Sequence, residues 1–306
     1  MGRLDDRVCV ITGAGRGIGS SLARTLAAQG GKIVVNDLGG AIDGSGSDQT
    51  PAQQVVDEIT AAGGQAVANY ADVSDYAQAE GLVQQALDTY GGLDVLINVA
   101  GILRDRMLFN MNEKEWDDVI RVHMKGTFNT SKFASIHWRS ERKGHYRLIN
   151  FTSVSGLYGN PGQPNYSAAK MGIVGFTLSS ANALARYGAT ANAISPGAQT
   201  RMIDDIPPER RRAGLAAAQD DKRSPDNIAP PVVYLASEDS DWLSGRVIGA
   251  RGYEIELVRN PVTEATLYSD KMWGIDEACE EMERVFKPMV EGRTSMMPRP
   301  YAHEQE

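Results

Sequence analysis

The chain has 306 residues, of which 42% are hydrophobic and 23% charged, a composition ordinary for a globular protein with a full core. Acidic residues outnumber basic ones by 39 to 31, so the net charge is −8. This excess argues against nonspecific nucleic-acid binding, which needs a basic surface. No apolar stretch approaches the ~20 residues that span a bilayer, and acidic residues lead into the first strand without a signal-peptide pattern. We therefore expect a cytoplasmic protein without membrane contact.

Short β-branched runs alternate with helix-length segments along most of the chain. The predicted strands are Arg7–Thr12, Lys32–Asn36, Gln65–Tyr70, Val95–Asn98, Arg147–Phe151, Thr190–Ile194 and Arg246–Gly249. The predicted helices include Ile18–Gln29, Tyr76–Tyr90, Glu113–Ser140 and Asn165–Tyr187. Most strands are apolar throughout, as expected when helices cover both faces of a parallel sheet. The pattern predicts one Rossmann-type, doubly wound α/β domain over residues 1–258, with a parallel sheet of about seven strands.

Other segments fall outside this alternation. Leu38–Pro51 is rich in Gly, Ser and Asp and predicts a surface loop. Residues 259–306 form a C-terminal extension, in which Ala265–Lys287 has helical spacing that Pro288 should end. Its apolar stripe favours packing against the main domain or a second subunit, and a lid over the active site is the alternative. Cys9 lies in an apolar strand, so no disulfide with Cys279 is expected.

A glycine-rich turn follows the first strand and precedes a helix. Such a turn lets the backbone approach a pyrophosphate, and the helix N-terminus offers N–H donors and a positive dipole end. The position of the turn between strand and helix strengthens an otherwise weak signal. The expected cofactor contacts are Thr12, Gly13, Arg16, Gly17, Ile18 and Gly19.

Asp37 ends the second strand, where a carboxylate can accept hydrogen bonds from the adenosine ribose and would repel a 2′-phosphate. Arg16 could favour the 2′-phosphate of NADP through its positive charge. The like-charge repulsion between that phosphate and Asp37 should dominate, so we expect NAD rather than NADP. The alternative is a solvated turn aspartate. We expect no metal ion.

Two further strand ends offer cofactor contacts. Asp72 and Val73 follow the third strand and could meet the adenine, although Asp72 could instead cap the next helix, a role for which Ser74 competes. Asn98, Ala100 and Gly101 close the fourth strand with small residues that leave room for a ribose.

Ser153, Tyr166 and Lys170 form the candidate catalytic group. Tyr166 and Lys170 are four residues apart on a helix and share a face. Lowering a tyrosine pKa from ~10 by ~3 units takes ~4 kcal/mol, which an ammonium at ~4 Å supplies only at an effective dielectric of ~20. In a dry site, Tyr166 could therefore exchange the hydroxyl proton while Ser153 holds the substrate oxygen. Singly, a Tyr-x-x-x-Lys pair is usually surface decoration.

Together these residues resemble the short-chain dehydrogenase/reductase family. The match includes Thr12–Gly19, Asp72, Asn98, the Ser153–Tyr166–Lys170 set, and Ser195-Pro196-Gly197 followed by Thr200. The resemblance implies that Tyr166 and Lys170 also touch the cofactor, and that Pro196, Gly197 and Thr200 contact its nicotinamide end. It also implies a homodimer or homotetramer formed through the helix carrying Tyr166 and its neighbour.

Several segments, such as Asn36–Gly40 and Arg121–Gly126, resemble the dehydrogenase part of peroxisomal multifunctional enzymes of type 2. That resemblance implies NAD-dependent oxidation of 3-hydroxyacyl-CoA thioesters, including those of bulky or steroid side chains. His123 stands where the wider family has a catalytic asparagine. It could hold a water or relay a proton, and the alternative is a helix residue satisfied by its neighbours.

CoA is polyanionic, so an acidic protein needs a local basic cluster for it. Candidates are Arg210, Arg211, Arg212, Lys222 and Arg223, although such a run is usually a solvated helix face. One rival function is a dehydrogenase of a free secondary alcohol, such as a hydroxysteroid or terpene alcohol. Others are an NADPH-dependent ketoacyl reductase, which Asp37 disfavours, and a non-catalytic dinucleotide-binding protein, which would not need Ser153, Tyr166 and Lys170.

Overall fold

The computed structural model describes residues 2–41, 43–142, 144–198 and 221–290. Packing divides the chain into two units, residues 1–258 and 259–306. Thr200 and Arg210–Arg212 of the sequence predictions lie outside the described residues.

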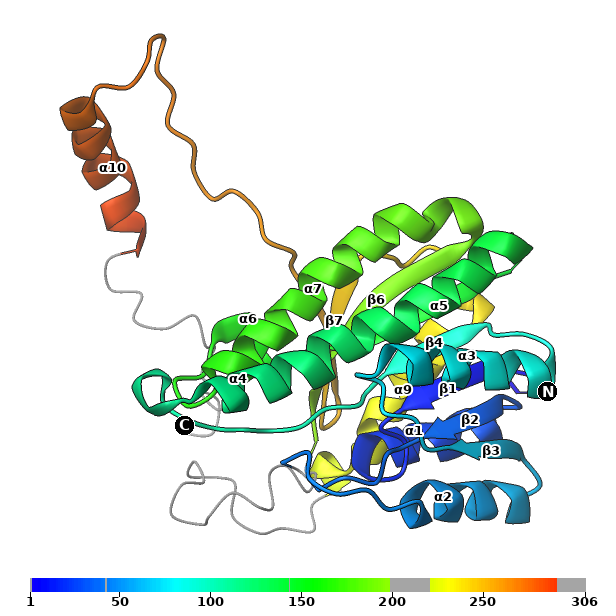
Figure 1. Cartoon of the computed structure of the whole chain (residues 1–306). Coiled ribbons are helices and arrows are strands. Elements are labelled where there is room, and N and C mark those ends of the chain that lie inside the picture. The colour runs from blue at the N-terminus through cyan, green and yellow to red at the C-terminus, as the bar shows by residue number, and fades with distance from the viewer. Residues whose placement is uncertain (1, 42, 143, 199–220, 291–306) are drawn as a thin grey trace. The chain divides into compact units, whose positions relative to one another are not determined.

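The first unit is built on one sheet of eight strands in the order β3-β2-β1-β4-β5-β6-β7-β8 (Figure 1). The strands are β1 (Val8–Thr12), β2 (Lys32–Asn36), β3 (Gln65–Asn69), β4 (Val95–Asn98), β5 (Tyr146–Phe151), β6 (Ala189–Gly197), β7 (Arg246–Arg251) and β8 (Glu254–Val258). The first seven are parallel, which confirms the Rossmann-type prediction.

The eighth strand was not predicted from the sequence. It pairs antiparallel with β7 after a tight turn in which Gly252 has a φ of 52°. Its sequence alternates Glu254 and Glu256 with Ile255 and Leu257, because an edge strand is only partly covered and need not be apolar throughout.

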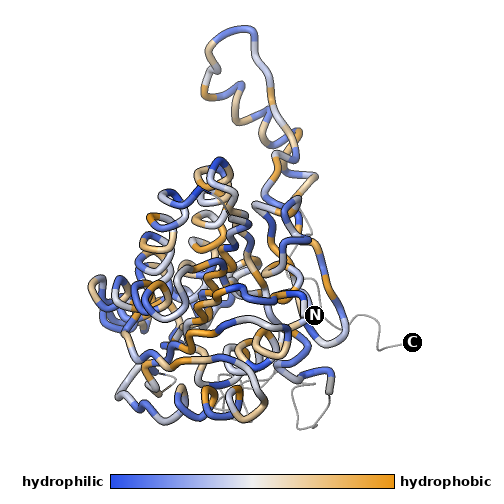
Figure 2. Tube along the Cα trace, turned by 90° about the vertical axis from the view of Figure 1, so that its right-hand side faces the viewer, coloured by the Kyte–Doolittle hydropathy of each residue, from blue (hydrophilic) through white to orange (hydrophobic). Residues whose placement is uncertain are grey.

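Helices cover both faces of the sheet (Figure 1). α1 (Gly17–Ala28), α2 (Thr50–Ala61) and α9 (Ala229–Ala236) pack on one face, and α3 (Tyr76–Tyr90), α5 (Gly126–Glu141) and α7 (Pro164–Leu184) pack on the other. Shorter helices are α4 (Glu113–Ile120) and α6 (Val154–Tyr158). Figure 2 shows the apolar strands flanked by helices in which hydrophilic and hydrophobic residues alternate.

The predicted single helix Glu113–Ser140 is interrupted. Between α4 and α5 the residues Arg121–Lys125 form a π-helical turn, which holds an extra residue that periodicity cannot reveal, and such turns are frequent at functional sites. The predicted loop Leu38–Pro51 is also shorter than expected, since α2 already begins at Thr50 with Pro51 in its first turn, a favoured position for proline.

In the second unit, the structure describes residues 259–290. The helix α10 runs over Ile275–Val290, so the predicted helix Ala265–Lys287 begins too early and ends too soon. Asp276 and Glu277 occupy the first turn, where acidic groups complement the helix dipole. Pro288 lies within the last described turn, where its missing N–H removes only one helical bond.

Both cysteines are free; Cys9 is buried and Cys279 is exposed. Among the helices of the described residues, none combines the length and apolar character needed to cross a membrane.

Candidate active site

The carboxyl ends of the parallel strands are aligned at one edge of the sheet. Thr12 at the end of β1 is paired with Asn36 of β2 and with Asn98 of β4, and Asn98 is paired with Asn150 of β5. Nearly all predicted site residues within the described chain lie at these strand ends or in the turns and helices that follow them. Ligands of open parallel sheets bind at this edge.

The glycine turn has the form that a dinucleotide pyrophosphate needs. Gly13 and Gly17 have φ angles of 66° and 54°, and a Cβ on Gly13 would lie 2.7 Å from the Cα of Ala100. No described side chain caps the first N–H groups of α1, whose N-cap is Arg16. The close backbone approach and the uncapped helix start fit a bound phosphate. Ile18 and Gly19 lie in the first turn of α1, and a Cβ on Gly19 would overlap the Gly13 carbonyl.

Asp37 is fixed beside this turn. The Gly15 amide donates to its Oδ2 at 2.8 Å and the Gly39 amide to its Oδ1 at 2.6 Å. Arg16 is 3.7 Å from a carboxylate oxygen of Asp48. The basic residue of the turn is therefore paired with an acid, and a second acid lies against the turn itself.

Thr12 and Asn98 hold strand ends together. The Thr12 Oγ1 accepts hydrogen bonds from the amides of Val99 and Ala100 at 3.1 and 3.2 Å. The Asn98 amide group is bonded to three polar side chains of the core: Thr130, Ser131 and Asn150. Both predicted cofactor residues are buried, so their side chains act by holding the strand ends in place.

Asp72 is held in a polar cluster after β3. Its Oδ1 accepts from the Ser74 amide and hydroxyl at 2.8 and 2.6 Å, and its Oδ2 lies 3.3 Å from Arg121. Asp75 caps α3, so the alternative in which Asp72 or Ser74 caps that helix is wrong. The Val73 side chain is buried.

Ser153, Tyr166 and Lys170 come together beyond the end of β5. Ser153 is the N-cap of α6, where its hydroxyl accepts from the Ser155 amide at 3.1 Å, and it lies close enough to the Tyr166 phenol to lower the pKa of that group. Lys170 follows one turn later on α7, with its Nζ 5.6 Å from the centre of the Tyr166 ring. Its ammonium donates to the Phe151 carbonyl at 2.7 Å.

Burial dominates the electrostatics of this group. It raises the pKa of Tyr166 to about 12, against the neighbouring Ser153 hydroxyl, which lowers it, and the Asp105 carboxylate raises the pKa further. Burial also lowers the pKa of Lys170 to about 7. The phenol is therefore less acidic than an ordinary tyrosine, because the cost of a buried phenolate outweighs the groups that favour it.

His123 lies in the π-helical turn, beside Tyr166. Its side chain is 1% exposed, and its ring meets the Tyr166 ring edge-on with centroids 5.2 Å apart. Burial lowers its pKa to about 3, so the ring is neutral at physiological pH. Its Nε2 is 2.8 Å from the Ile102 carbonyl oxygen, while its Nδ1 has no hydrogen-bond partner among the described residues. Only one of the two ring nitrogens therefore has a hydrogen-bond partner among the described residues. The alternative, in which His123 is a helix residue fully satisfied by its neighbours, holds for that nitrogen alone.

The ring of His123 also explains Gly101. A Cβ on Gly101 would overlap the His123 Cε1, so any side chain there would displace the ring. Gly101, which is predicted to leave room for a ribose, also leaves room for this imidazole.

Asn165, which was not among the predicted site residues, fixes the start of α7. It is fully buried, and its side-chain amide donates to the carbonyls of Arg104 and Glu115 at 3.0 and 2.9 Å. Its Oδ1 accepts from the Tyr166 amide at 2.7 Å. The sequence feature that could have indicated this role is an asparagine directly before the tyrosine in the first turn of the helix.

A second polar group surrounds Gln163, just before α7. Its side chain donates to Asp105 at 2.9 Å and accepts from the Ser155 hydroxyl at 2.8 Å. Burial raises the pKa of Asp105. This network joins the segment after β4 to the turn between α6 and α7.

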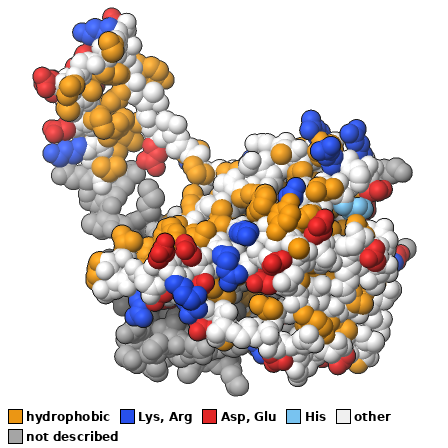
Figure 3. Space-filling view, viewed as in Figure 1, with side chains coloured by type: hydrophobic (Ala, Val, Ile, Leu, Met, Phe, Trp, Pro, Cys, Tyr) orange, Lys and Arg blue, Asp and Glu red, His pale blue; other side chains and the backbone are white. Residues whose placement is uncertain are grey.

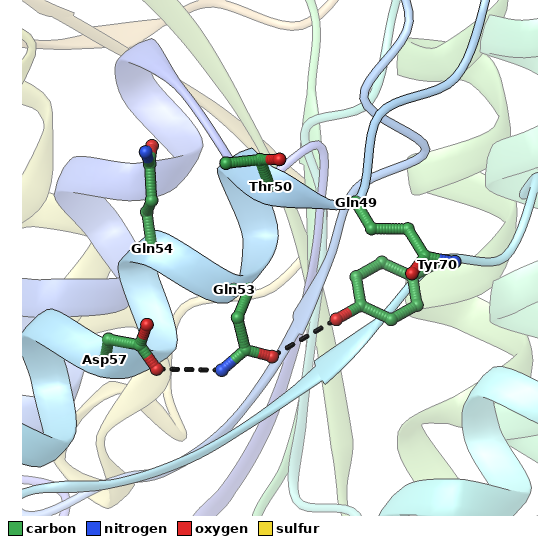
Figure 4. A pocket seen from close by; sticks show the side chains of 6 residues that line it. All are labelled: Gln49, Thr50, Gln53, Gln54, Asp57 and Tyr70. Carbon is green, nitrogen blue, oxygen red and sulfur yellow. Dashed lines mark hydrogen bonds between the residues drawn. The ribbon is translucent and has the colours of Figure 1, made fainter.

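Two small hollows lie on the first unit. One, of about 20 Å³, is lined by Pro196 and Gly197 together with residues of α6, β7 and β8, and it has room for one water molecule. The other, of about 300 Å³, lies on α2 and is lined by Gln49, Thr50, Gln53, Gln54, Asp57 and Tyr70 (Figure 4). Gln53 bonds to both Asp57 and Tyr70, and no predicted site residue lines this hollow.

The basic residues proposed for CoA are only partly described. Lys222 and Arg223 lie in a short 3-10 helix, and the Lys222 ammonium is 6.0 Å from the centre of the Tyr253 ring.

Comparisons with known proteins agree with this geometry. The short chain dehydrogenase family model matches residues 7–210. The structure resembles a short chain dehydrogenase from Mycobacterium avium with a TM-score of 0.81 and 41% identity, covering 94% of this chain and 96% of that one. The chain belongs to the short-chain dehydrogenase family: it is an oxidoreductase that uses a nicotinamide dinucleotide.

Two relatives within this family are similar to the chain over most of its length. Hydroxyacyl-CoA dehydrogenase ChsB1 of Mycobacterium tuberculosis is 42% identical over 277 residues, covering 87% of this chain and 84% of the relative. Peroxisomal multifunctional enzyme type 2 of Mus musculus is 40% identical over 243 residues, which cover 79% of this chain but 31% of that protein. The resemblance seen in the sequence is confirmed, and the chain spans about a third of the mouse enzyme.

Proposed function

We propose that the protein is an NAD-dependent 3-hydroxyacyl-CoA dehydrogenase in which Ser153, Tyr166 and Lys170 handle the substrate hydroxyl. The observation that carries the chemistry is the convergence of Ser153 and Lys170 on Tyr166, with the Lys170 ammonium 5.6 Å from the centre of the Tyr166 ring. The substrate class is supported by its likeness to a hydroxyacyl-CoA dehydrogenase at 42% identity.

The residues divide the work of alcohol oxidation between them. The Ser153 hydroxyl holds the C3 oxygen of the substrate, and Tyr166 takes the hydroxyl proton. A bound NAD⁺ supplies the hydride acceptor. Because the Tyr166 pKa is raised to about 12, a positive charge near the phenol is needed for proton removal, and protonated Lys170 provides one. In the reverse direction a protonated phenol is already the correct general acid.

The preference for NAD over NADP rests on the acids at the glycine turn. Asp37 accepts hydrogen bonds from the amides of Gly15 and Gly39, and a 2′-phosphate there would meet its negative charge. Arg16, the residue that could offset this repulsion, is paired with Asp48.

Self-association is supported by an apolar surface. Apolar side chains gather on the outer side of α5 and α7 (Figure 3), where Phe128, Ile136 and Met171 are exposed. We propose that these helices pair with a second copy in a homodimer or homotetramer. Analytical ultracentrifugation of the wild type and of Ile136→Glu tests this, and an unchanged sedimentation coefficient would contradict it.

The decisive experiment measures kcat/KM with NAD⁺ for a 3-hydroxyacyl-CoA and for the same acyl group as an N-acetylcysteamine thioester. The latter keeps the reacting carbons and the thioester but lacks the CoA phosphates. We expect the CoA thioester to be preferred by at least tenfold, which corresponds to about 1.4 kcal/mol. Equal values for both, or a higher value for a free secondary alcohol, would favour the alcohol dehydrogenase function. A measured preference for NADP⁺ would refute the cofactor assignment.

The same substrate pair tests the basic cluster. Replacing Arg210, Arg211 and Arg212 by alanine should raise KM for the CoA thioester far more than for the N-acetylcysteamine thioester. Equal effects on the two would remove these arginines from the proposal.

A further inference from the structure

The segment between β2 and α2 reaches across the sheet edge. A Cβ on Gly44 would lie 3.1 Å from the Ile102 side chain, and the Asp43 carboxylate is 3.4 Å from the Arg104 guanidinium. Ile102 and Arg104 follow β4, and β1 lies between β2 and β4. A segment that leaves β2 and touches residues beyond β4 therefore spans the carboxyl end of β1, which the glycine turn follows.

The base of this segment is tied down at the β2 end. The Asp48 amide donates to the Leu38 carbonyl at 3.1 Å, and the Asp48 carboxylate pairs with Arg16 in the glycine turn. In Figure 1 the segment is the blue loop that leaves β2 and returns to α2. We name residues 38–41 and 43–48 the strap. Its base is held by backbone and ionic contacts, whereas its far end is held by Asp43 and by the contact of Gly44.

Arg104, which holds the far end of the strap, is itself fixed in place. The Arg104 side chain is 26% exposed and makes a second ion pair of 3.3 Å with Asp118 of α4, which is 14% exposed. The Arg104 carbonyl accepts from the buried Asn165. Asp43, at 51% exposed, is the end of the pair that is free to leave. Breaking the pair would therefore release the strap and leave Arg104 in place.

We propose that the strap is a latch over the dinucleotide cleft, and that the Asp43–Arg104 ion pair sets how fast the cofactor enters and leaves. The inference rests on the proposed placement of the pyrophosphate at the start of α1. A dinucleotide seated there lies beneath the strap, because the strap spans the carboxyl end of β1 between its contacts with Arg16 and Arg104. Exchange of the cofactor then requires the far end of the strap to lift.

The test is stopped-flow NADH fluorescence, which reads association and dissociation without turnover. In the wild type, the Asp43 Oδ1 accepts hydrogen bonds from the Ser45 amide and hydroxyl at 2.9 and 2.7 Å. Asp43→Asn removes the charge but keeps an oxygen that can accept both bonds. An exposed ion pair is worth at most ~1 kcal/mol, so both rate constants should rise about two- to fivefold. Asp43→Lys, which repels Arg104, should raise them further, and Asp43→Glu should restore the wild-type rates.

A latch has a signature that a simple contact lacks. Opening of a gate limits both directions, so both rate constants rise together and the Kd for NADH stays within twofold. Asp118→Asn is the matched control: it removes the other acidic partner of Arg104 without touching the strap, and exchange should not accelerate. Salt at 1 M should speed the wild type toward the Asp43→Asn rates, because it screens exposed charges.

The latch is refuted if Asp43→Lys exchanges NADH no faster than the wild type, or if only dissociation rises. These outcomes differ from a failure of the proposed function. A protein that binds NADPH in place of NADH refutes the cofactor assignment, and the same rate measurements with NADPH then decide the latch.

Discussion

The Lys170 ammonium donates a hydrogen bond to the backbone carbonyl of Phe151 at 2.7 Å, at the last residue of β5. The lysine is thus anchored to the sheet edge, with its charge 5.6 Å from the centre of the Tyr166 ring. Burial brings its pKa to about 7 while the pKa of Tyr166 rises to about 12. The phenol can therefore be acidified only by a lysine that keeps its proton.

This relationship predicts the pH dependence of alcohol oxidation. Log kcat/KM should rise with pH as Tyr166 ionises, because a phenolate that forms beside Lys170 stabilises the protonated lysine. Lys170→Met should therefore move the apparent pKa upward. A charge at ~6 Å and an effective dielectric of ~20 contributes ~3 kcal/mol, so a shift of about 1 to 2 units is expected. Lys132→Met, which removes a lysine on α5 that lies over Phe133, is the control and should leave the profile unchanged. Overlapping profiles for Lys170→Met and wild type would contradict the role of Lys170.

Replacing Tyr166 by phenylalanine removes the proton-transfer group and keeps the ring that packs against His123. We expect kcat to fall by about 10²- to 10⁴-fold, the usual contribution of general acid–base catalysis. NADH affinity, measured by fluorescence titration, should change only a few-fold. Undiminished turnover in Tyr166→Phe would instead support a non-catalytic dinucleotide-binding protein.

His123 should make the fold sensitive to acid. Its pKa in the folded protein is about 3, below the ordinary value of 6.5, so the unfolded chain binds the extra proton between these pH values. The free energy of unfolding should therefore fall as pH drops from about 6.5 toward 3, with each pKa unit worth ~1.4 kcal/mol. His123→Asn should lose this slope. Urea denaturation at pH 7 and pH 4.5 measures it, and parallel pH curves for the two proteins would show that His123 carries no such linkage.

Gly101 and His123 should be energetically coupled. Gly101→Ala pushes a methyl group into the imidazole and should cost about 1–3 kcal/mol, as overpacking does. His123→Ala removes the obstructing ring, so in that background Gly101→Ala should cost less than 1 kcal/mol. A double-mutant cycle from urea midpoints measures the coupling. Additive effects would mean that the ring is not the obstacle.

Most of the fold could be predicted because local periodicity and global topology agree. The bounds of Lys32–Asn36, Val95–Asn98 and Tyr76–Tyr90 match the structure residue for residue, since buried parallel strands are apolar throughout and the helices between them are amphipathic. The strand β8 and the π-helical turn at Arg121–Lys125 were missed. An edge strand carries charges that resemble those of a loop, and one inserted residue hardly changes the periodicity of a long helix.

The residues of the candidate site were predictable as a set, because the carboxyl ends of parallel strands meet at one edge whatever the details of packing. Their individual environments were not. Asn98 turns into a core network, Gly101 accommodates an imidazole, and Asn165 joins the start of α7 to the segment after β4. These contacts join residues far apart in the chain, so no local pattern encodes them.

The amino-acid sequence by itself determined the alternation of strands and helices, the glycine turn, and the set of Ser153, Tyr166 and Lys170. Only the tertiary structure decided that the phenol is made less acidic, that His123 is neutral, and that the strap meets Arg104 across the glycine turn. The reason is physical: burial and the distance between remote groups set pKa values and ion pairs, and both exist only once the chain has folded.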